Sequence, residues 1–244
     1  MSTIDPAVRE FLLAFADDEH LMGQRHTEWI GVAPFLEEDM AFASIGQDEL
    51  GHAALLYEVV SDDIDELALH RLPQDYRSCW LVEEPCTDWA DALIRHWLYD
   101  TAEVLRWESL VSSSLSDLGD IARRALREEA FHIRHANALL DALLGSGEAQ
   151  ARLLTSLDRL FPLAAGLFEA PAGESAALEG GVSASPMQSL LSPWRQAVDD
   201  RFGERDWTKV DPPDQQQRRM RSEHFELMYA SMREVILLDP TAVW

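Results

Sequence analysis

Residues 37–61 read EEDMAFASIGQDELGHAALLYEVVS, and their apolar pattern decides the fold. Apolar side chains recur three and four residues apart, which is the spacing of one face of an α-helix. The stretch opens with three acidic residues, which complement the positive end of a helix dipole. We therefore predict a helix from about Leu36 to Val60. Glu49 and His52 stand on its apolar face, where burial of an acid and an imidazole is costly unless something compensates them.

Three other long helices follow from the same periodicity. One covers residues 6–29, after a proline at the position that often opens helices. Another covers residues 88–113, with Thr87 or Asp88 as its cap, and a third covers residues 121–145 and ends at Gly145. Residues 61–87 form a long connection with a short helical piece at 64–70. Helix pairs joined by tight turns, with one long crossover between the pairs, are typical of a ferritin-like four-helix bundle, so we predict an all-α fold of this kind.

The rest of the chain predicts further helices that pack outside the bundle. We expect a helix over 149–168, a flexible loop over 170–185, a shorter helix after Pro193 and a last helix over 215–238. Residues 1–244 are treated as a single ferritin-like domain, in which the core bundle covers about 5–145 and the additional helices cover about 146–244.

Composition argues against several classes of partner and location. The 244 residues carry a net charge of −24, from 44 acidic and 20 basic residues, which repels phosphate backbones and anionic lipids. We therefore expect no nucleic acid and no membrane among the partners. The N-terminus shows no basic region followed by an unbroken apolar stretch, and no run of about 18 apolar residues occurs later, so a cytoplasmic location is expected. Cys79 and Cys86 match no redox or zinc spacing and are expected to be free thiols.

Two copies of the motif Glu-x-x-His carry the chemistry. The first is Glu49 with His52, and the second is Glu129 with His132, in the middle of an apolar stripe of the helix over 121–145. Residues three apart on a helix point the same way, so the carboxylate and the imidazole of one motif can bind the same metal ion. Two such motifs on facing helices make a two-metal centre when each of the other two helices supplies a carboxylate.

The other two helices each offer such a carboxylate. Glu28 lies near the end of the helix over 6–29, and Asp100 lies on an apolar stripe of the helix over 88–113. Glu103 is one turn from Asp100 and is an alternative for the same role. Carboxylates with two imidazoles suit iron or manganese better than zinc, and iron is our first choice. The predicted metal ligands are Glu28, Glu49, His52, Asp100, Glu129 and His132.

Each part of this cluster, taken by itself, can also be explained without a metal ion. A Glu-His pair can be a hydrogen-bonded pair on a helix surface, and Asp100 can be satisfied by Arg106. Six polar groups at one depth on four apolar stripes, however, leave costly buried charge unless a cation neutralises it. His26 and His135 are candidates for orienting ligands, although exposed positions are more common for such residues. Tyr57 invites the idea of a radical site, but packing in the core is the simpler interpretation.

Seven blocks of sequence carry a resemblance to a known family. In chain order they are GQRHTEW, GVAPFLEEDMAFASIGQDELGHA, YRSCWLVEEP, DWADALIRHWLYD, ALREEAFHIRHA, LDRLFPLAAGLFE and EHFELMYASMREVILLDPTAVW. Over nearly its whole length the chain resembles the subunits of the bacterial phenylacetyl-CoA epoxidase, a multicomponent ferritin-like oxygenase of aerobic phenylacetate degradation. Apart from the two Glu-x-x-His motifs, the sequence is most similar to the C subunit of that complex.

The resemblance implies a function, but the two Glu-x-x-His motifs of this chain depart from the pattern of the C subunit. In the family, the C subunit has lost iron ligands and serves as partner of the catalytic A subunit, whereas QDELGH and REEAFH here are similar to the motifs of the catalytic subunit. The implied activity is that of a di-iron oxygenase component that uses O2 to epoxidise or hydroxylate an aromatic acyl-CoA or a related substrate. The family link, and not the residue spacing, supplies the epoxidation, and it implies an oligomer with this chain or another ferritin-like subunit.

The chain offers no cofactor motif besides the metal ligands. It contains no four-cysteine iron–sulfur pattern and no flavin or nicotinamide fingerprint, and no haem is expected, so electrons must come from a separate reductase. Two rival functions stay open. One is a structural subunit that stabilises a catalytic partner and keeps the metal motif as a remnant, and the other is a ferroxidase or a similar oxidase that uses the same ligands.

Overall fold

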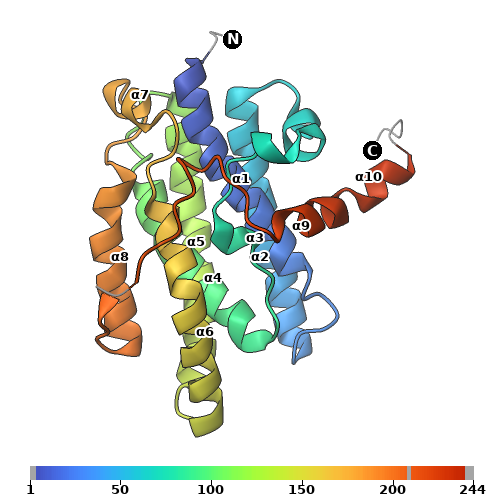
Figure 1. Cartoon of the computed structure of the whole chain (residues 1–244), viewed down its shortest axis with the longest axis vertical. Coiled ribbons are helices and arrows are strands. Elements are labelled where there is room, and N and C mark those ends of the chain that lie inside the picture. The colour runs from blue at the N-terminus through green and yellow to red at the C-terminus, as the bar shows by residue number, and fades with distance from the viewer. Residues whose placement is uncertain (1–3, 208–209, 240–244) are drawn as a thin grey trace.

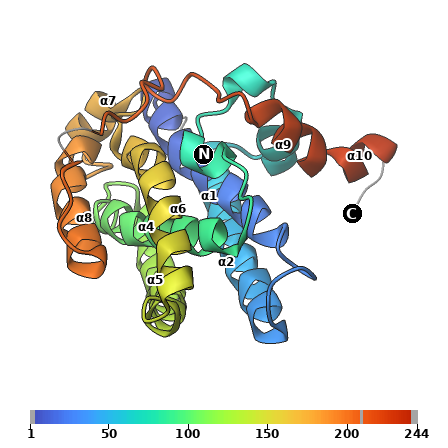
Figure 2. The ribbon, with the colours of Figure 1, turned by 60° about the horizontal axis from the view of Figure 1, so that its bottom comes forward.

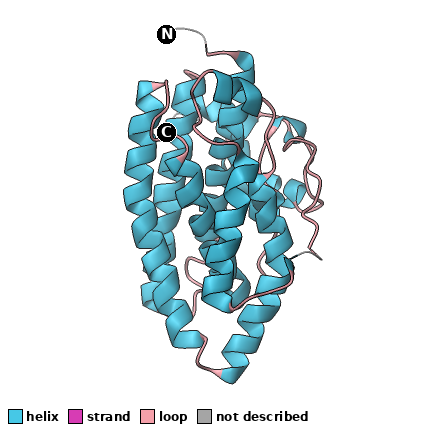
Figure 3. Ribbon diagram, turned by 90° about the vertical axis from the view of Figure 1, so that its left-hand side faces the viewer, coloured by secondary structure: helices cyan, strands magenta, loops and turns pink. Residues whose placement is uncertain are grey.

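Four long helices form the centre of the molecule (Figure 1). A computed structural model describes residues 4–207 and 210–239. The central helices are α1 (Pro6–Thr27), α2 (Leu36–Val60), α4 (Trp89–Glu108) and α5 (Ser116–Leu143). Within the described residues every regular element is a helix (Figure 3). The prediction of an all-α, ferritin-like bundle is thereby confirmed.

The four helices pack as two antiparallel pairs. α1 lies along α2, and α4 lies along α5, while the seam between α2 and α5 is much smaller (Figure 2). The bounds of α2 match the prediction, and Asp88 caps α4 by accepting a hydrogen bond from the backbone N–H of Asp91. α5 begins five residues earlier than expected, and it ends with Leu144 as its cap, so Gly145 lies in the following turn instead of closing the helix.

Two glycines allow α1 and α2 to approach closely. A Cβ on Gly23 would lie 2.7 Å from Cγ of Leu50 and 3.0 Å from the carbonyl oxygen of Gly46. A Cβ on Gly46 would in turn lie 3.1 Å from Cβ of His26. Packing at this separation leaves no space for even one extra methyl group, so these two residues fix how near the acidic side chains of α1 come to those of α2.

The connection between the two pairs is long and irregular, as predicted. It contains a π-helical turn (η1, Glu66–His70), a 3-10 turn (η2, Pro73–Asp75) and a short helix (α3, Trp80–Glu83). Carboxylates of α1 anchor it, because Asp17 accepts from Arg71 and from the backbone N–H of Arg77, and Asp18 accepts from the backbone N–H of Cys79. Tyr57 donates to Asp17 over 2.6 Å and belongs to the same anchor, which agrees with a packing role.

The next three helices after α5 cover the outside of the central bundle, where the first and third pack on α4 and the second packs on α1. They are α6 (Gly147–Ala165, followed by the 3-10 turn η3, Gly166–Phe168), α7 (Glu174–Glu179) and α8 (Met187–Phe202). The apolar side chains of α6 and α8 share one core with α4, and the rings of Phe161 and Trp194 stack within it at 5.0 Å. α7 occupies part of the stretch predicted as a flexible loop. α8 begins before Pro193 and continues through it.

The prediction of one last helix over residues 215–238 is wrong. Only α9 (Phe225–Met232) and α10 (Glu234–Leu238) are helical there. α9 packs its buried Phe225 and Tyr229 against Tyr76 of the connection, and α10 extends away from the bundle (Figure 1). Gln216, Gln217 and Arg218 have positive φ angles. The physical reason is that polar side chains of this segment bond across the bundle instead of pointing to solvent. Gln215 donates to the carbonyl of Gly166, and the guanidinium of Arg218 donates to buried Asp18.

Two smaller predictions concern single features. Cys79 and Cys86 are both free thiols, and Cys79 is buried. Among the described residues, no helix combines the length and the apolar character that a membrane crossing requires. Residues 240–244, which end the last of the seven similar blocks, lie outside the described residues.

Candidate metal centre

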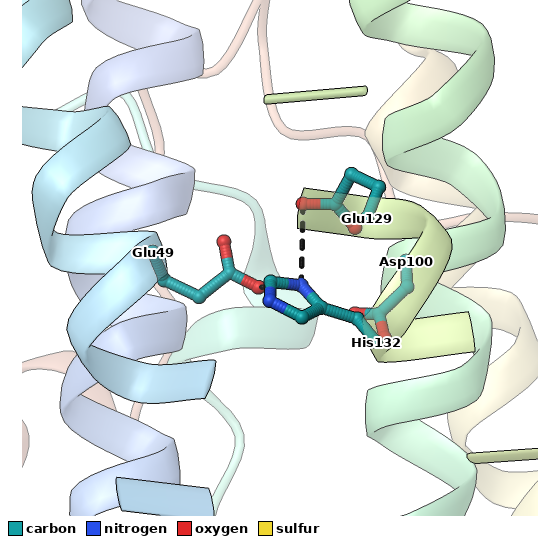
Figure 4. Close-up of side chains that lie close together, drawn as sticks. All are labelled: Glu49, Asp100, Glu129 and His132. Atoms are coloured by element: carbon teal, nitrogen blue, oxygen red, sulfur yellow. Dashed lines mark ion pairs between the residues drawn. The ribbon is translucent and has the colours of Figure 1, made fainter. Parts of the chain in front are cut away.

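Acidic and imidazole side chains from all four central helices converge in the middle of the bundle. The side chains form two groups, and within each group the potential ligand atoms all lie within 4.8 Å of one another. One group consists of Glu19, Glu49 and His52, and the other consists of Glu49, Asp100, Glu129 and His132. Figure 4 shows the second group, in which Glu49 reaches from α2 toward the side chains of α4 and α5. Glu49 belongs to both groups, so the two potential sites are adjacent and share a carboxylate.

The free bonding capacity of these side chains fits a pair of divalent cations. Glu49, Asp100 and Glu129 are fully buried, and no oxygen of their carboxylates has a hydrogen-bond partner. Nδ1 of His132 likewise has none. Buried carboxylates without partners are costly. Four ionised carboxylates, with that of Glu19 included, carry a charge that two divalent ions balance, and the donor set matches the carboxylate-rich sites of ferritin-like bundles.

The carboxylate that α1 supplies is Glu19, and the structure corrects the expectation for Glu28. Glu28 caps the end of α1, is 41% exposed and pairs with Arg25 over 2.7 Å. The reason is the register of the antiparallel pair. Glu49 lies 13 residues after the start of α2 at Leu36, which is about 20 Å along the helix, whereas Glu28 stands beside the turn.

Asp100, and not Glu103, is the α4 carboxylate that joins the cluster. Glu103 forms an ion pair with Arg106 on the same helix, and Arg106 also donates to Asp18 over 2.8 Å. Burial raises the pKa of Glu103 well above its ordinary value, although the positive charge of Arg106 opposes this shift. Glu103 is thus occupied by a cation of the protein itself, which leaves Asp100 for the cluster.

Two further carboxylates hold the outer nitrogens of the two motif histidines. Nε2 of His52 lies 2.8 Å from Oε2 of Glu128, on the opposite helix α5. Nε2 of His132 lies 3.4 Å from Oδ2 of Asp48, on α2. In both rings, Nδ1 faces the cluster. Carboxylates behind metal-binding histidines fix the ring and its tautomer. The sequence signal is the acid that directly precedes the Glu of each motif, and the prediction of ligands from the Glu-x-x-His spacing missed it.

The charges of the cluster shift the pKa values of both histidines upward. Burial alone would lower the pKa of His52, but contacts with Glu19 and Glu49 outweigh burial and raise it to about 12. Burial also opposes the shift at His132, where Asp48 and Glu129 raise the pKa to about 12. Without metal, both imidazoles are therefore protonated at neutral pH and provide the positive charge that the carboxylates require.

Three carboxylates of the cluster, those of Glu19, Glu49 and Glu129, have raised pKa values, and burial is the main cause at each. Burial, together with the charge of Glu49, raises the pKa of Glu19 to about 7. Burial is also the main cause at Glu129, where the nearby charges of Asp100 and Glu19 add to it and the pKa reaches about 8. The metal-free cluster thus holds protons that a metal ion must displace, which couples metal binding to proton release.

A groove between α2 and α5 leads to this cluster from outside. Its volume is about 580 Å³, and His132 forms part of its wall. The wall also contains Ile45 from α2 and the exposed ring of Phe131 from α5, with Arg134 beside that ring. A groove of this size, with an apolar part beside several polar and charged side chains, suits a small organic molecule that has both apolar and polar groups.

Comparisons with known proteins find similarity along nearly the whole chain. A family model described as "Phenylacetic acid catabolic protein" matches residues 2–244. The C subunit of the 1,2-phenylacetyl-CoA epoxidase of Escherichia coli K12 is 28% identical over 246 aligned residues, which cover 96% of this chain and 98% of that protein. The A subunit of the same enzyme is 27% identical over 129 residues, or 52% of this chain and 42% of that protein.

Proposed function

The chain belongs to the phenylacetic acid catabolic protein family, and on that premise we propose that it is a di-iron oxygenase component. Its reaction would be the O2-dependent epoxidation or hydroxylation of an aromatic acyl-CoA or a related substrate. The observation that carries this proposal is the pair of overlapping ligand groups that share Glu49. A remnant motif would have no reason to keep matched donors from all four helices buried together, with the carboxylates of Glu49, Asp100 and Glu129 free of hydrogen-bond partners.

Each side chain of the centre has a role that follows from its place. Glu19 and His52 would hold one ion, and Asp100, Glu129 and His132 would hold the other. Glu49 would lie between the ions, and Glu128 and Asp48 would keep the two imidazole rings in position. When bound, a pair of iron ions supplies the oxygen-activating redox chemistry that no side chain of this chain offers. Manganese fits the same donors.

The substrate and the partners follow from the groove and from the charge of the chain. The groove between α2 and α5 opens on His132, and the apolar part of its wall suits the aromatic end of a substrate. The net charge of −24 provides few groups for the phosphates of coenzyme A. We therefore propose that another ferritin-like subunit holds that part of the substrate, and that a separate reductase supplies the electrons.

Metal analysis of the purified chain tests the proposal directly. We expect about two iron ions per chain after iron-replete expression. Glu49→Ala should lose both ions because both sites use this carboxylate, and Glu19→Ala should lose one. Glu28→Ala is the matched control, since Glu28 lies on the same helix outside the cluster, and it should keep both ions. Iron content that is zero in the wild-type chain, or unchanged by Glu49→Ala, contradicts the proposed centre.

A scaffolding role within an epoxidase complex is the rival with a specific observation in its favour. The similarity to the C subunit extends over nearly the whole chain, whereas the similarity to the A subunit extends over about half of it. An iron-loaded chain that consumes O2 and forms an oxygenated aromatic product, when a reductase is supplied, favours the oxygenase. O2 consumption during Fe(II) oxidation without any organic product favours a ferroxidase, and a chain that takes up no iron favours the scaffold.

A further inference from the structure

The end of the centre next to Asp100 is surrounded by histidines that the proposed metal site does not use. His26 comes from α1, His96 from α4 and His135 from α5, and the rings of His26 and His96 meet edge to face at 5.1 Å. His26 and His96 are fully buried, and His135 is 22% exposed at its side chain. The sequence favoured exposed positions for His26 and His135. Burial of an imidazole costs free energy unless the ring has a polar partner.

A row of close polar contacts connects Asp100 to the surface through two of these histidines. Nδ1 of His96 lies 2.8 Å from Oδ2 of Asp100, one helical turn away on α4. Nε2 of His96 lies 3.3 Å from Nδ1 of His135, and Nε2 of His135 lies 2.8 Å from Oε2 of Glu38 on α2. Three helices thus contribute to one continuous row that ends at a candidate metal ligand.

Asp100 depends on His96 more than the other candidate ligands depend on any single group. Among the described residues, His96 is the one ion-pair partner of Asp100, whereas Glu19 contacts both His52 and the hydroxyl of Tyr99. Nδ1 of His96 and the carboxylate are near enough for a hydrogen bond but are not in line for one, so both oxygens of Asp100 keep their bonding capacity. A small rotation of the carboxylate brings one oxygen into line and leaves the other for a cation.

We propose that His96 is a positioning residue that fixes Asp100 as a ligand of the ion on the α4–α5 side, and that His135 and Glu38 support it. This inference rests on the proposed two-metal centre. An N–H donor behind a ligating carboxylate holds its orientation and raises the affinity for the metal. For His96 to donate to Asp100 while His135 donates to Glu38, the two rings carry three N–H protons, and the third lies between Nε2 of His96 and Nδ1 of His135.

If His96 positions Asp100, loss of His96 should change the affinity for the two ions to different extents. The ion on the α1–α2 side would use Glu19, Glu49 and His52, none of which contacts His96. Loss of the His96 donor should therefore weaken only the ion on the α4–α5 side. A merely structural role for His96, as part of the packed ring cluster, predicts instead that the two ions weaken together or that neither does.

Titration of the metal-free full chain with Mn(II), followed by electron paramagnetic resonance, distinguishes these outcomes. Two Mn(II) ions that share a carboxylate give an exchange-coupled signal, and one ion alone gives the hyperfine pattern of an isolated ion. His96→Leu should weaken one of the two ions by about 10–100-fold, with the isolated pattern at intermediate Mn(II). His96→Asn should restore the coupled signal, because its amide N–H replaces the Nδ1 donor.

His26→Leu is the matched control. It removes an equally buried imidazole from the same ring cluster, but neither nitrogen of His26 has a hydrogen-bond partner. It should therefore keep both ions at wild-type affinity. Two ions retained with unchanged affinity in His96→Leu, or equal losses in His96→Leu and His26→Leu, overturn the positioning role alone. A wild-type chain that binds no Mn(II) overturns the two-metal centre as well. If His96→Leu does not fold, His96→Asn against His96→Ser decides the same question, because serine cannot reach Asp100.

Discussion

His52 on α2 is held by Glu128 on α5, with 2.8 Å between its Nε2 and the carboxylate oxygen. The reverse contact runs from His132 on α5 to Asp48 on α2. Each motif histidine is thus oriented by the acid that precedes the other motif's glutamate. The two contacts cross the seam between α2 and α5, where the helices pack much less than within the pairs α1–α2 and α4–α5. The histidine positions and the closure of this seam therefore depend on each other.

Glu128→Gln should lower the affinity for the ion on the α1–α2 side by about 10–100-fold, because the amide no longer provides a charged acceptor for the N–H of His52. The change is isosteric, so packing at the seam is conserved. Calorimetric titration of the metal-free chain with Mn(II) measures the metal affinity. Asp120→Asn, on the exposed face of the same helix, is the control and should leave both affinities unchanged. Equal affinities in the two variants would show that Glu128 does not support the site.

Much of the centre could be predicted from the sequence, because helical periodicity fixes which residues share a face. Glu49 with His52 and Glu129 with His132 are three residues apart on apolar stripes, and they do meet in the middle of the bundle. Depth along a helix is harder to predict. Glu28 lies on a suitable helix but beside its turn, and only the antiparallel register of α1 and α2 shows that Glu19 faces Glu49.

The stretch around Glu19 carries a signal of its own. Residues 17–20 read DDEH between the apolar residues 11–16 and 21–22 of α1, and all four are buried. Apolar periodicity does not show that α1 is buried on all sides at this level. The segment over 215–224 was mispredicted for a related reason, since buried partners for Gln215 and Arg218 lie far away in the sequence and local helix propensity does not report them.

The metal-free protein should become less stable as pH rises from about 7 to 8.5. His52 and His132 have raised pKa values near 12, so the folded chain keeps their protons above the pKa of about 6.5 at which the unfolded chain releases them. Glu129 adds to this, since its pKa of about 8 in the folded chain lies above its ordinary value. The folded state binds more protons, so the free energy of unfolding falls with pH in this window.

Urea unfolding in the presence of a chelator at several pH values measures this slope. The slope should shrink in a His52→Asn, His132→Asn double variant, which lacks the two main proton-binding groups. Added Mn(II) should reverse the trend in the wild-type chain, because fewer protons remain to be displaced at higher pH and the metal binds more tightly. A metal-free chain whose stability rises between pH 7 and 8.5 would contradict the protonated state assigned to the two histidines.

Asp18→Asn should reduce the free energy of unfolding by about 3–5 kcal/mol, as expected when a buried ion pair loses one partner. Asp18 accepts from Arg106 on α4, from Arg218 in the segment that crosses the bundle, and from the backbone N–H of Cys79. The substitution removes the ion-pair partner of buried Arg218 and leaves buried Arg106 with Glu103 alone. Glu10→Gln is the control on the same helix, because its pair with Arg77 is partly exposed and should contribute less than about 1 kcal/mol. Similar midpoints of urea unfolding for both variants would rule out the anchoring role of Asp18.

The close approach of α1 and α2 gives a prediction that separates packing from helix propensity. Gly23→Ala should destabilise the chain by about 1–3 kcal/mol, because the new methyl group would lie 2.7 Å from Cγ of Leu50. Gly51→Ala, also inside a helix, meets nothing within 4 Å and should stabilise the chain by about 0.4–1 kcal/mol.

The same pair of variants tests whether helix spacing sets the geometry of the metal centre. Gly23 lies one turn from Glu19 on α1, so a methyl group that separates the two helices also moves Glu19 away from Glu49. Gly23→Ala should therefore weaken the ion on the α1–α2 side in addition to its effect on stability, and Gly51→Ala should leave metal affinity unchanged. Thermal unfolding and Mn(II) titration of both variants provide the two measurements. Normal metal affinity in a destabilised Gly23→Ala chain would mean that the helices absorb the methyl group elsewhere and that the spacing at Gly23 does not control the site.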